Sequence, residues 1–141
     1  WPKNSTDLNW FKSHTLNNIV LMGRKTWEDP NMPTPLKLRK NVLVTNKNPS
    51  LFPEADLCIS GDVNEKILDI EKENLDKDIY IIGGSEIINL TFSLIQRFYL
   101  TRIYGNYNCE KFLNISLIEK NMKLIEKIDG DKSCHFEIWE K

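Results

Sequence analysis

Short apolar runs alternate with amphipathic or turn-forming segments along the chain. The runs are rich in β-branched and aromatic residues and predict strands at residues 19–22, 41–45, 57–59, 79–82, 98–101, 123–125 and 135–139. Four runs are almost continuously apolar, which is typical of strands covered on both faces in a parallel or mixed sheet. The last run alternates more, as expected of an antiparallel strand.

Helical patterns occupy the intervals between these runs. A helix at residues 6–14 would carry Leu8, Phe11 and Thr15 on one side, with Thr6 as its N-cap. Further helices are predicted at residues 63–73 and 85–92, and the proline-rich segment 30–35 must be a loop. Because strands alternate with helices and no linker or repeat interrupts them, residues 1–141 predict a single α/β domain with a largely parallel sheet.

Composition and charge narrow the classes of partner. The formal net charge is -1, which gives no electrostatic reason to expect nucleic acid or an anionic membrane as a partner. No apolar run approaches the length of a membrane span. The three cysteines are far apart, and only His14 and His135 could add nitrogen ligands. We therefore expect reduced thiols in a cytoplasmic protein, with no metal site and no disulfide.

Two glycine-containing turns follow predicted strands, where open α/β sheets bind ligands. The run 23–26, Gly-Arg-Lys-Thr, begins a short helix whose N–H groups and basic side chains suit a phosphate. The pair Gly83-Gly84 would let a ligand approach the backbone closely. Taken alone, the first could equally be a capped helix with a solvated basic pair, and the second a turn required by packing.

Two charged residues have similar double interpretations. Asp7 lies early in the first predicted helix, where an acid stabilises the helix dipole without any further function, but where it could also be catalytic. Arg39, just before a strand, could be a surface charge or could hold a carboxylate through two parallel hydrogen bonds.

The order of these blocks resembles the dihydrofolate reductase family. The matching blocks are Asp7-Leu8-x-Trp10-Phe11-Lys12-x-x-Thr15, Met22-Gly23-Arg24-Lys25-Thr26-Trp27-Glu28, Pro35-Leu36-Lys37-x-Arg39-x-Asn41-Val42, Ile82-Gly83-Gly84 and Tyr99-Leu100-Thr101-x-Ile103. The Gly-Arg-Lys-Thr-Trp run is highly specific to that family, and the resemblance extends over the whole chain in one register. It implies a three-layer dihydrofolate-reductase-like fold, with a central, mostly parallel mixed sheet, helices on both faces and an antiparallel C-terminal strand.

The resemblance also implies a substrate, 7,8-dihydrofolate, and its contacts. Asp7 would accept hydrogen bonds from the pterin and favour protonation at N5, as the catalytic residue, and Thr101 would hydrogen-bond this acid. Arg39 would clamp the α-carboxylate of the glutamate tail. The full set of implied substrate contacts is Asp7, Leu8, Phe11, Leu36, Arg39, Ile82 and Thr101.

The implied cofactor is NADPH, which would transfer a hydride to C6 of the pterin. Arg24 would lie near its 2'-phosphate, and Gly83 and Gly84 would be joined by a cis peptide. The implied cofactor contacts are Gly23, Arg24, Lys25, Thr26, Thr45, Asn46, Ile82, Gly83, Gly84, Ser85, Glu86 and Ile87. The implied product, tetrahydrofolate, belongs to one-carbon metabolism. Antifolates such as trimethoprim and methotrexate are the further ligands that the resemblance implies. We expect the protein to be a monomer.

The sequence departs from the family at several points. The family's N-terminal strand and the loop that closes over the nicotinamide precede the position of Trp1, so we expect residues 1–141 alone to be unstable or poorly active. Glu86, Ile88 and the turn at 109–111 differ from common family residues, and the loop at 29–34 is longer and richer in proline.

Two other functions remain open. One is a reductase of the same fold that acts on a ribosylated pyrimidine in riboflavin synthesis, because fold alone does not fix substrate. The other is a non-catalytic folate-binding, nucleotide-binding or structural protein derived from the reductase.

Overall fold

The computed structural model describes residues 5–30, 32, 34–103, 115–132 and 134–141, which form two compact units. One unit contains residues 14–93, and the other combines residues 1–13 with residues 94–141. Each unit has its own sheet. The Cys109 turn at 109–111 and Trp1 lie outside the described residues.

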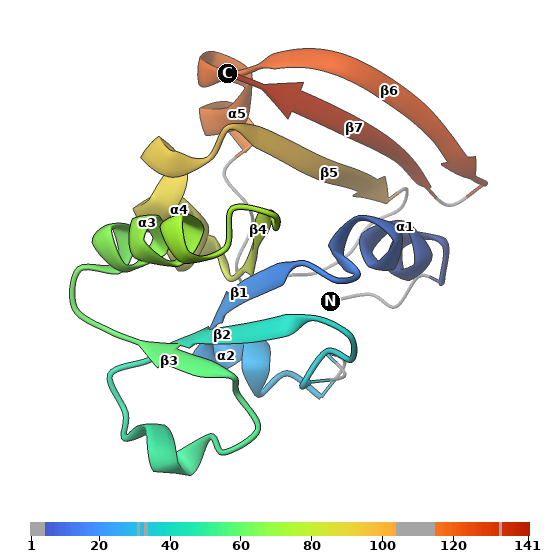
Figure 1. Ribbon diagram of the computed structural model, residues 1–141. Helices are drawn as coiled ribbons and strands as arrows, with labels where there is room; N and C mark the ends of the chain where they lie inside the picture. Colours follow the sequence, from blue (N-terminus) through green and yellow to red (C-terminus); the bar gives the residue numbers. More distant parts are fainter. Residues whose placement is uncertain (1–4, 31, 33, 104–114, 133) are drawn as a thin grey trace. The chain divides into compact units, whose positions relative to one another are not determined.

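The unit of residues 14–93 is built on a parallel sheet with the strand order β3-β2-β1-β4 (Figure 1). The strands are β1 (Ile19–Gly23), β2 (Lys40–Val44), β3 (Leu57–Ile59) and β4 (Ile79–Gly83). From Ile19 to Met22 every side chain of β1 is 0% exposed. Such a strand must be entirely apolar, because a polar side chain here would be desolvated without compensation. The central position of β1 therefore explains its continuous hydrophobic run.

Helices of this unit follow the strands in the order expected of an α/β protein. They are α2 (Arg24–Trp27), α3 (Val63–Glu73), α4 (Ser85–Thr91) and the short 3-10 turns Pro49–Leu51 and Phe92–Leu94. The side chain of Asp62 caps α3 by accepting a hydrogen bond from the backbone N–H of Glu65 at 3.2 Å. Asn64 of α3 donates to the carbonyl of Leu90 in α4, which ties these two helices together (Figure 1).

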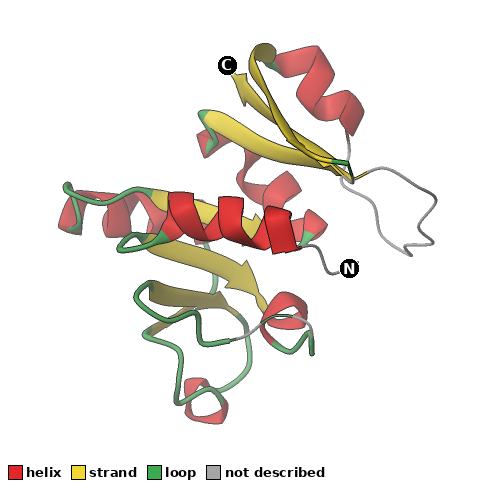
Figure 2. Ribbon diagram, turned by 90° about the vertical axis from the view of Figure 1, so that its right-hand side faces the viewer, coloured by secondary structure: helices red, strands yellow, loops and turns green. Residues whose placement is uncertain are grey.

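The other unit contains an antiparallel sheet with the order β5-β7-β6 (Figure 2). Its elements are β5 (Arg97–Ile103), α5 (Ile115–Asn121), β6 (Lys123–Asp131), β7 (Cys134–Glu140) and most of α1 (Ser5–Thr15). Trp10 of α1 stacks on Phe136 of β7 with ring centroids 4.3 Å apart, and meets Tyr99 of β5 edge-on at 5.8 Å. These aromatic contacts hold α1 against one face of the sheet.

The predicted fold class is confirmed, as an α/β protein with parallel strands and an antiparallel C-terminal strand. The strands of the described residues pair as two sheets, however, where one central sheet was expected. The prediction of Thr6 as an N-cap was wrong, because α1 already includes Ser5 and so places Thr6 inside the helix. The sequence also missed α5, which buries mainly Ile118, and the second half of β6, whose residues are almost all exposed.

Within the described part of the chain, no helix is both long enough and apolar enough to cross a membrane. The same residues contain no cluster of three or more His, Cys, Asp and Glu side chains that could hold a metal ion.

Candidate functional site

Two glycine turns lie side by side at the carboxyl edge of the parallel sheet. Strands β1 and β4 are neighbours, and Met22 at the end of β1 pairs with Gly83 at the end of β4. A Cβ on Gly23 would lie 3.0 Å from Cγ1 of Ile87, and one on Gly83 would lie 3.2 Å from the hydroxyl oxygen of Thr26. Gly83 also has φ +144°, a backbone conformation that side chains disfavour. Both turns therefore need glycine for close packing.

The hydroxyl of Thr26 lies against the Gly83-Gly84 turn. A Cβ on Gly84 would be 3.7 Å from the same oxygen, so one hydroxyl faces both glycines. The peptide between Gly83 and Gly84 is cis, as the resemblance implies. The structure thus brings the Gly23–Thr26 block and the Gly83-Gly84 block together, although they are far apart in the sequence.

Basic side chains supply positive charge at this edge. The helix α2 is only one turn long, so its dipole contributes little, and the charge comes mainly from Arg24 and Lys25. Arg24 donates from Nη1 to Oε2 of Glu28 at 3.0 Å, and both side chains are partly exposed. An exposed pair of this kind is weak, so an anionic ligand can compete with Glu28 for the guanidinium.

The remaining predicted cofactor residues lie at the same sheet edge. Thr45 directly follows β2, where its N–H donates to the carbonyl of Ile59 at the end of β3 and its hydroxyl accepts from the N–H of Lys47. Asn46 beside it is exposed. The others belong to β4 or to the first turn of α4, and they are Ile82, Ser85, Glu86 and Ile87.

Two predicted substrate residues, Leu36 and Arg39, lie at the opposite edge, just before β2 begins. Leu36 is buried. The guanidinium of Arg39 donates from Nε to the carbonyl of Lys37 at 3.0 Å and from Nη1 to the hydroxyl of Thr15 at 3.1 Å. Partial burial lowers the pKa of Arg39 from its ordinary value, but an arginine keeps its charge throughout the physiological range.

Asn41 was given no role by the sequence, yet its side chain organises this loop. It is 2% exposed and makes three hydrogen bonds with the backbone of Leu36 and Arg39. The signal available in the sequence was a polar residue at the start of an otherwise apolar strand, which usually means that its amide is satisfied internally.

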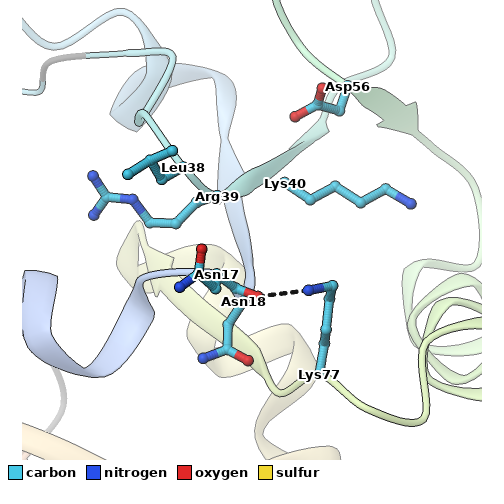
Figure 3. Close-up of a pocket in the computed structure, with 7 residues that line it drawn as sticks. All are labelled: Asn17, Asn18, Leu38, Arg39, Lys40, Asp56 and Lys77. Carbon is cyan, nitrogen blue, oxygen red and sulfur yellow. Dashed lines mark hydrogen bonds between the residues drawn. The ribbon is translucent and has the colours of Figure 1, made fainter.

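Arg39 also lines a pocket of about 540 Å³ at the amino ends of β1, β2 and β4 (Figure 3). Lys77 closes one side of it by donating from Nζ to the carbonyl of Asn17 at 2.7 Å. The full lining is Asn17, Asn18, Leu38, Arg39, Lys40, Asp56 and Lys77. Since parallel strands share one direction, this pocket and the glycine turns are at opposite ends of the same sheet.

Ile82, which was also predicted to contact the substrate, lies in β4, and the other predicted substrate residues belong to the unit of residues 1–13 and 94–141. Asp7 is the third residue of α1, and its side chain lies outside the described residues. Leu8 and Phe11 of α1 are half-buried. Thr101 of β5 pairs directly with Phe136, on which Trp10 stacks, so α1 covers the sheet face that carries Thr101. The predicted residues thus form two groups, one in each unit.

A buried carboxylate on the opposite face of this sheet escaped the sequence interpretation. Oε2 of Glu137 lies 2.7 Å from Nε2 of His135, while Trp139 donates to Oε1 at 3.0 Å and Nε of Arg102 donates to Oε2 at 3.3 Å. Burial alone would raise the pKa of Glu137, but the hydrogen bonds from His135 and Trp139 and the charge of Arg102 outweigh it and lower the pKa. The cluster stabilises the sheet and lies away from the Thr101 face.

The sequence is similar to dihydrofolate reductases from several organisms. It is 32% identical to that of Buchnera aphidicola subsp. Schizaphis graminum over 71% of this chain and 58% of the relative. Identity to the Bacillus subtilis enzyme is 30%, over 89% of this chain and 70% of the relative. For dihydrofolate reductase type 8 of Escherichia coli it is 26%, over 96% and 81%.

The match to the Buchnera relatives spans less than two thirds of their length, 58% of one and 55% of another. The family model of dihydrofolate reductase matches residues 3–139, which include the glycine turns, Arg39 and Thr101, and the chain therefore belongs to the dihydrofolate reductase family.

Proposed function

We propose that the protein containing this chain is an NADPH-dependent dihydrofolate reductase, which converts 7,8-dihydrofolate to 5,6,7,8-tetrahydrofolate. The observation that carries the proposal is the adjacency of the Gly23–Thr26 and Gly83-Gly84 turns at the carboxyl edge of the parallel sheet. In an open α/β sheet this is the edge at which ligands bind. Membership of the dihydrofolate reductase family supports a nicotinamide cofactor as the ligand at this edge.

The residues at this edge fit a dinucleotide with several phosphates. In the proposal, phosphates approach the backbone of Gly83 and Gly84, which carry no side chain. Glycine is also needed at position 83 for packing, because a Cβ there would lie 3.2 Å from the hydroxyl of Thr26. Arg24 and Lys25 would hold phosphate groups, with Arg24 leaving Glu28 for the 2'-phosphate. Thr45, Asn46, Ser85, Glu86 and Ile87 complete the proposed cofactor contacts. When bound, NADPH supplies a hydride to C6 of the pterin.

The chain's own residues would orient the substrate and manage the proton. In the proposal, Asp7 accepts two hydrogen bonds from the pterin ring and its negative charge favours a proton at N5. Thr101 holds the Asp7 carboxylate, and Leu8, Phe11 and Leu36 exclude water from the rings. Arg39 binds the glutamate carboxylate, and the carbonyl of Ile82 faces the pterin.

Further properties belong to the same proposal. We place the protein in the cytoplasm as a monomer that binds small molecules, with no nucleic acid, membrane or metal partner. Antifolates such as trimethoprim and methotrexate would occupy the pterin position, because a diaminopyrimidine ring offers the same donors to Asp7.

We also propose that activity needs the strand and loop that family members carry before the position of Trp1. Within the described residues, β4 pairs on one edge only, with β1, and β5 pairs on one edge only, with β7. An unpaired edge exposes backbone groups that a further strand could satisfy.

The test follows NADPH absorbance in the presence of dihydrofolate. The 141-residue chain is compared with the same chain extended by the first strand and loop of a family member, with Asp7→Asn in the extended form as the control. Turnover in the extended chain that Asp7→Asn lowers mainly at neutral pH supports the proposal. Tight dihydrofolate binding without turnover would favour a non-catalytic binding protein, and turnover of a ribosylated pyrimidine alone would favour the riboflavin-type reductase. If the extended chain neither turns over nor binds dihydrofolate, the folate assignment is wrong.

A further inference from the structure

Two buried polar side chains converge on the loop that carries Arg39. Asn41 bonds to the backbone on both sides of the loop, and Thr15 bonds to the guanidinium itself. We propose that Thr15 and Asn41 are positioning residues for Arg39, and that they set how strongly the protein prefers a substrate with a carboxylate tail. This rests on the proposed function, which makes Arg39 the carboxylate ligand.

The amide of Asn41 fixes the loop at its start and at its end. Its Oδ1 accepts from the N–H of Leu36 at 2.9 Å, and its Nδ2 donates to the carbonyls of Leu36 and Arg39, also at 2.9 Å. Only a side chain with both a donor and an acceptor can make this set of bonds. Asn41 is itself anchored, because its backbone N–H donates to Oδ2 of Asp56 at 2.6 Å.

The loop is held in a conformation that it would not adopt alone. Leu38, directly before Arg39, has φ +61°, in the left-handed region that disfavours side chains with a Cβ. The N–H of Asn17 donates to the carbonyl of Leu38 at 2.8 Å and, with the Asn41 bonds, keeps it there. Losing the Asn41 amide would therefore release Arg39 as well as Leu36.

Thr15 acts on the other end of the arginine. Its side chain is buried at 1% exposure, at the C-terminal end of α1, and its hydroxyl accepts from Nη1 of Arg39 at 3.1 Å. The carbonyl of Lys37 accepts from Nε at 3.0 Å. Bonds to two different nitrogens fix the plane of a guanidinium, and a fixed plane is what bidentate binding of a carboxylate requires.

The experiment compares two substrates in the extended protein, dihydrofolate and the same pterin–benzoate without its glutamate. Thr15→Val keeps the volume and removes the acceptor. We expect it to lower the preference for the tail-bearing substrate, as a ratio of kcat/KM values, by roughly tenfold through KM. Thr15→Ser keeps the hydroxyl and should restore the preference to within about twofold.

Controls separate positioning from structural damage. Thr91 is another fully buried threonine, whose hydroxyl donates to the carbonyl of Ile87 at 2.7 Å, so Thr91→Val should lower stability without changing the substrate preference. In an Arg39→Ala background, Thr15→Val should have no additional effect on the preference, because the group that it positions is gone. Asn41→Asp, which loses the amide donors, should lower the preference in the same way if the variant folds.

The possible outcomes are distinct. Equal effects of Thr15→Val on both substrates, or effects that add to those of Arg39→Ala, would overturn the positioning role. If the unsubstituted extended protein reduces neither substrate, the proposed function itself fails, and this is seen before any variant is made.

Discussion

Replacing Glu137 with glutamine should destabilise the antiparallel sheet. The carboxylate is only 10% exposed and is surrounded by donors from His135, Trp139 and Arg102. Glutamine has nearly the same shape, but it turns one acceptor oxygen into a donor that faces another donor. Truncating one partner of a buried charge pair costs about 3–5 kcal/mol.

A smaller loss is expected here because Arg102 is 34% exposed and water can compensate part of its pairing. We therefore expect the free energy of unfolding to fall by about 2 kcal/mol, which moves the urea midpoint by roughly 1 M. Urea unfolding of the extended protein, followed by circular dichroism, measures this shift. Glu140→Gln is the matched control, since its ion pair with Arg97 is exposed and should contribute little.

The pH dependence gives the sign of the effect independently. The pKa of Glu137 is lowered in the folded protein, so its stabilisation is present above the unfolded pKa of a glutamate, about 4.3, and is lost as the pH falls below it. The difference in stability between the parent protein and Glu137→Gln should therefore be full at neutral pH and shrink in acid. A midpoint shift no larger than that of Glu140→Gln, or one independent of pH, would refute this account of the cluster.

Three further predictions concern the loops and turns. Gly83→Ala should weaken NADPH binding at least tenfold in a fluorescence titration, because φ of Gly83 is +144° and the new Cβ would lie 3.2 Å from Thr26. An unchanged Kd would contradict the proposal that NADPH binds against the Gly83-Gly84 turn. Leu38→Asn should stabilise the protein by about 0.5–1 kcal/mol in urea, since Leu38 is 73% exposed at φ +61° and asparagine tolerates that conformation better; destabilisation would mean that the leucine has an unseen packing role. Arg24→Ala should raise the Kd for NADPH roughly tenfold but that for NADH far less, and equal effects on both would move Arg24 away from the 2'-phosphate.

The elements with a clear pattern of apolar residues were predictable from the sequence. The apolar run of β1 left little choice of structure, and its neighbours β2 and β4 followed from similar runs within one residue at each end. The helix α3 was predictable because Val63, Ile67 and Ile70 repeat at helical spacing. By contrast, α5 is short and buries mainly Ile118 and so carries little periodic signal.

The interactions between distant segments were not predictable in the same way. The alternation of β7 puts His135, Glu137 and Trp139 on one face, but the sequence does not say that Arg102 lies opposite, because this depends on the register with β5. The bond between Arg39 and Thr15 joins residues 24 positions apart. Motif resemblance predicted that Arg39 binds a ligand, but the groups that bond to its guanidinium become visible only in the folded chain.

The strand β2 has Arg39 immediately before it and Thr45 immediately after it. These residues, one proposed for the substrate tail and one for the cofactor, are therefore separated by a rigid extended segment of about 20 Å. Val42 and Leu43 within it are fully buried on opposite faces of the sheet, so inserting or deleting one residue would disrupt the register in which they fill the core. The core thus fixes the distance between Arg39 and Thr45. Differences in ligand size among family members would then be accommodated by changes in the loops, such as the proline-rich segment at 29–34.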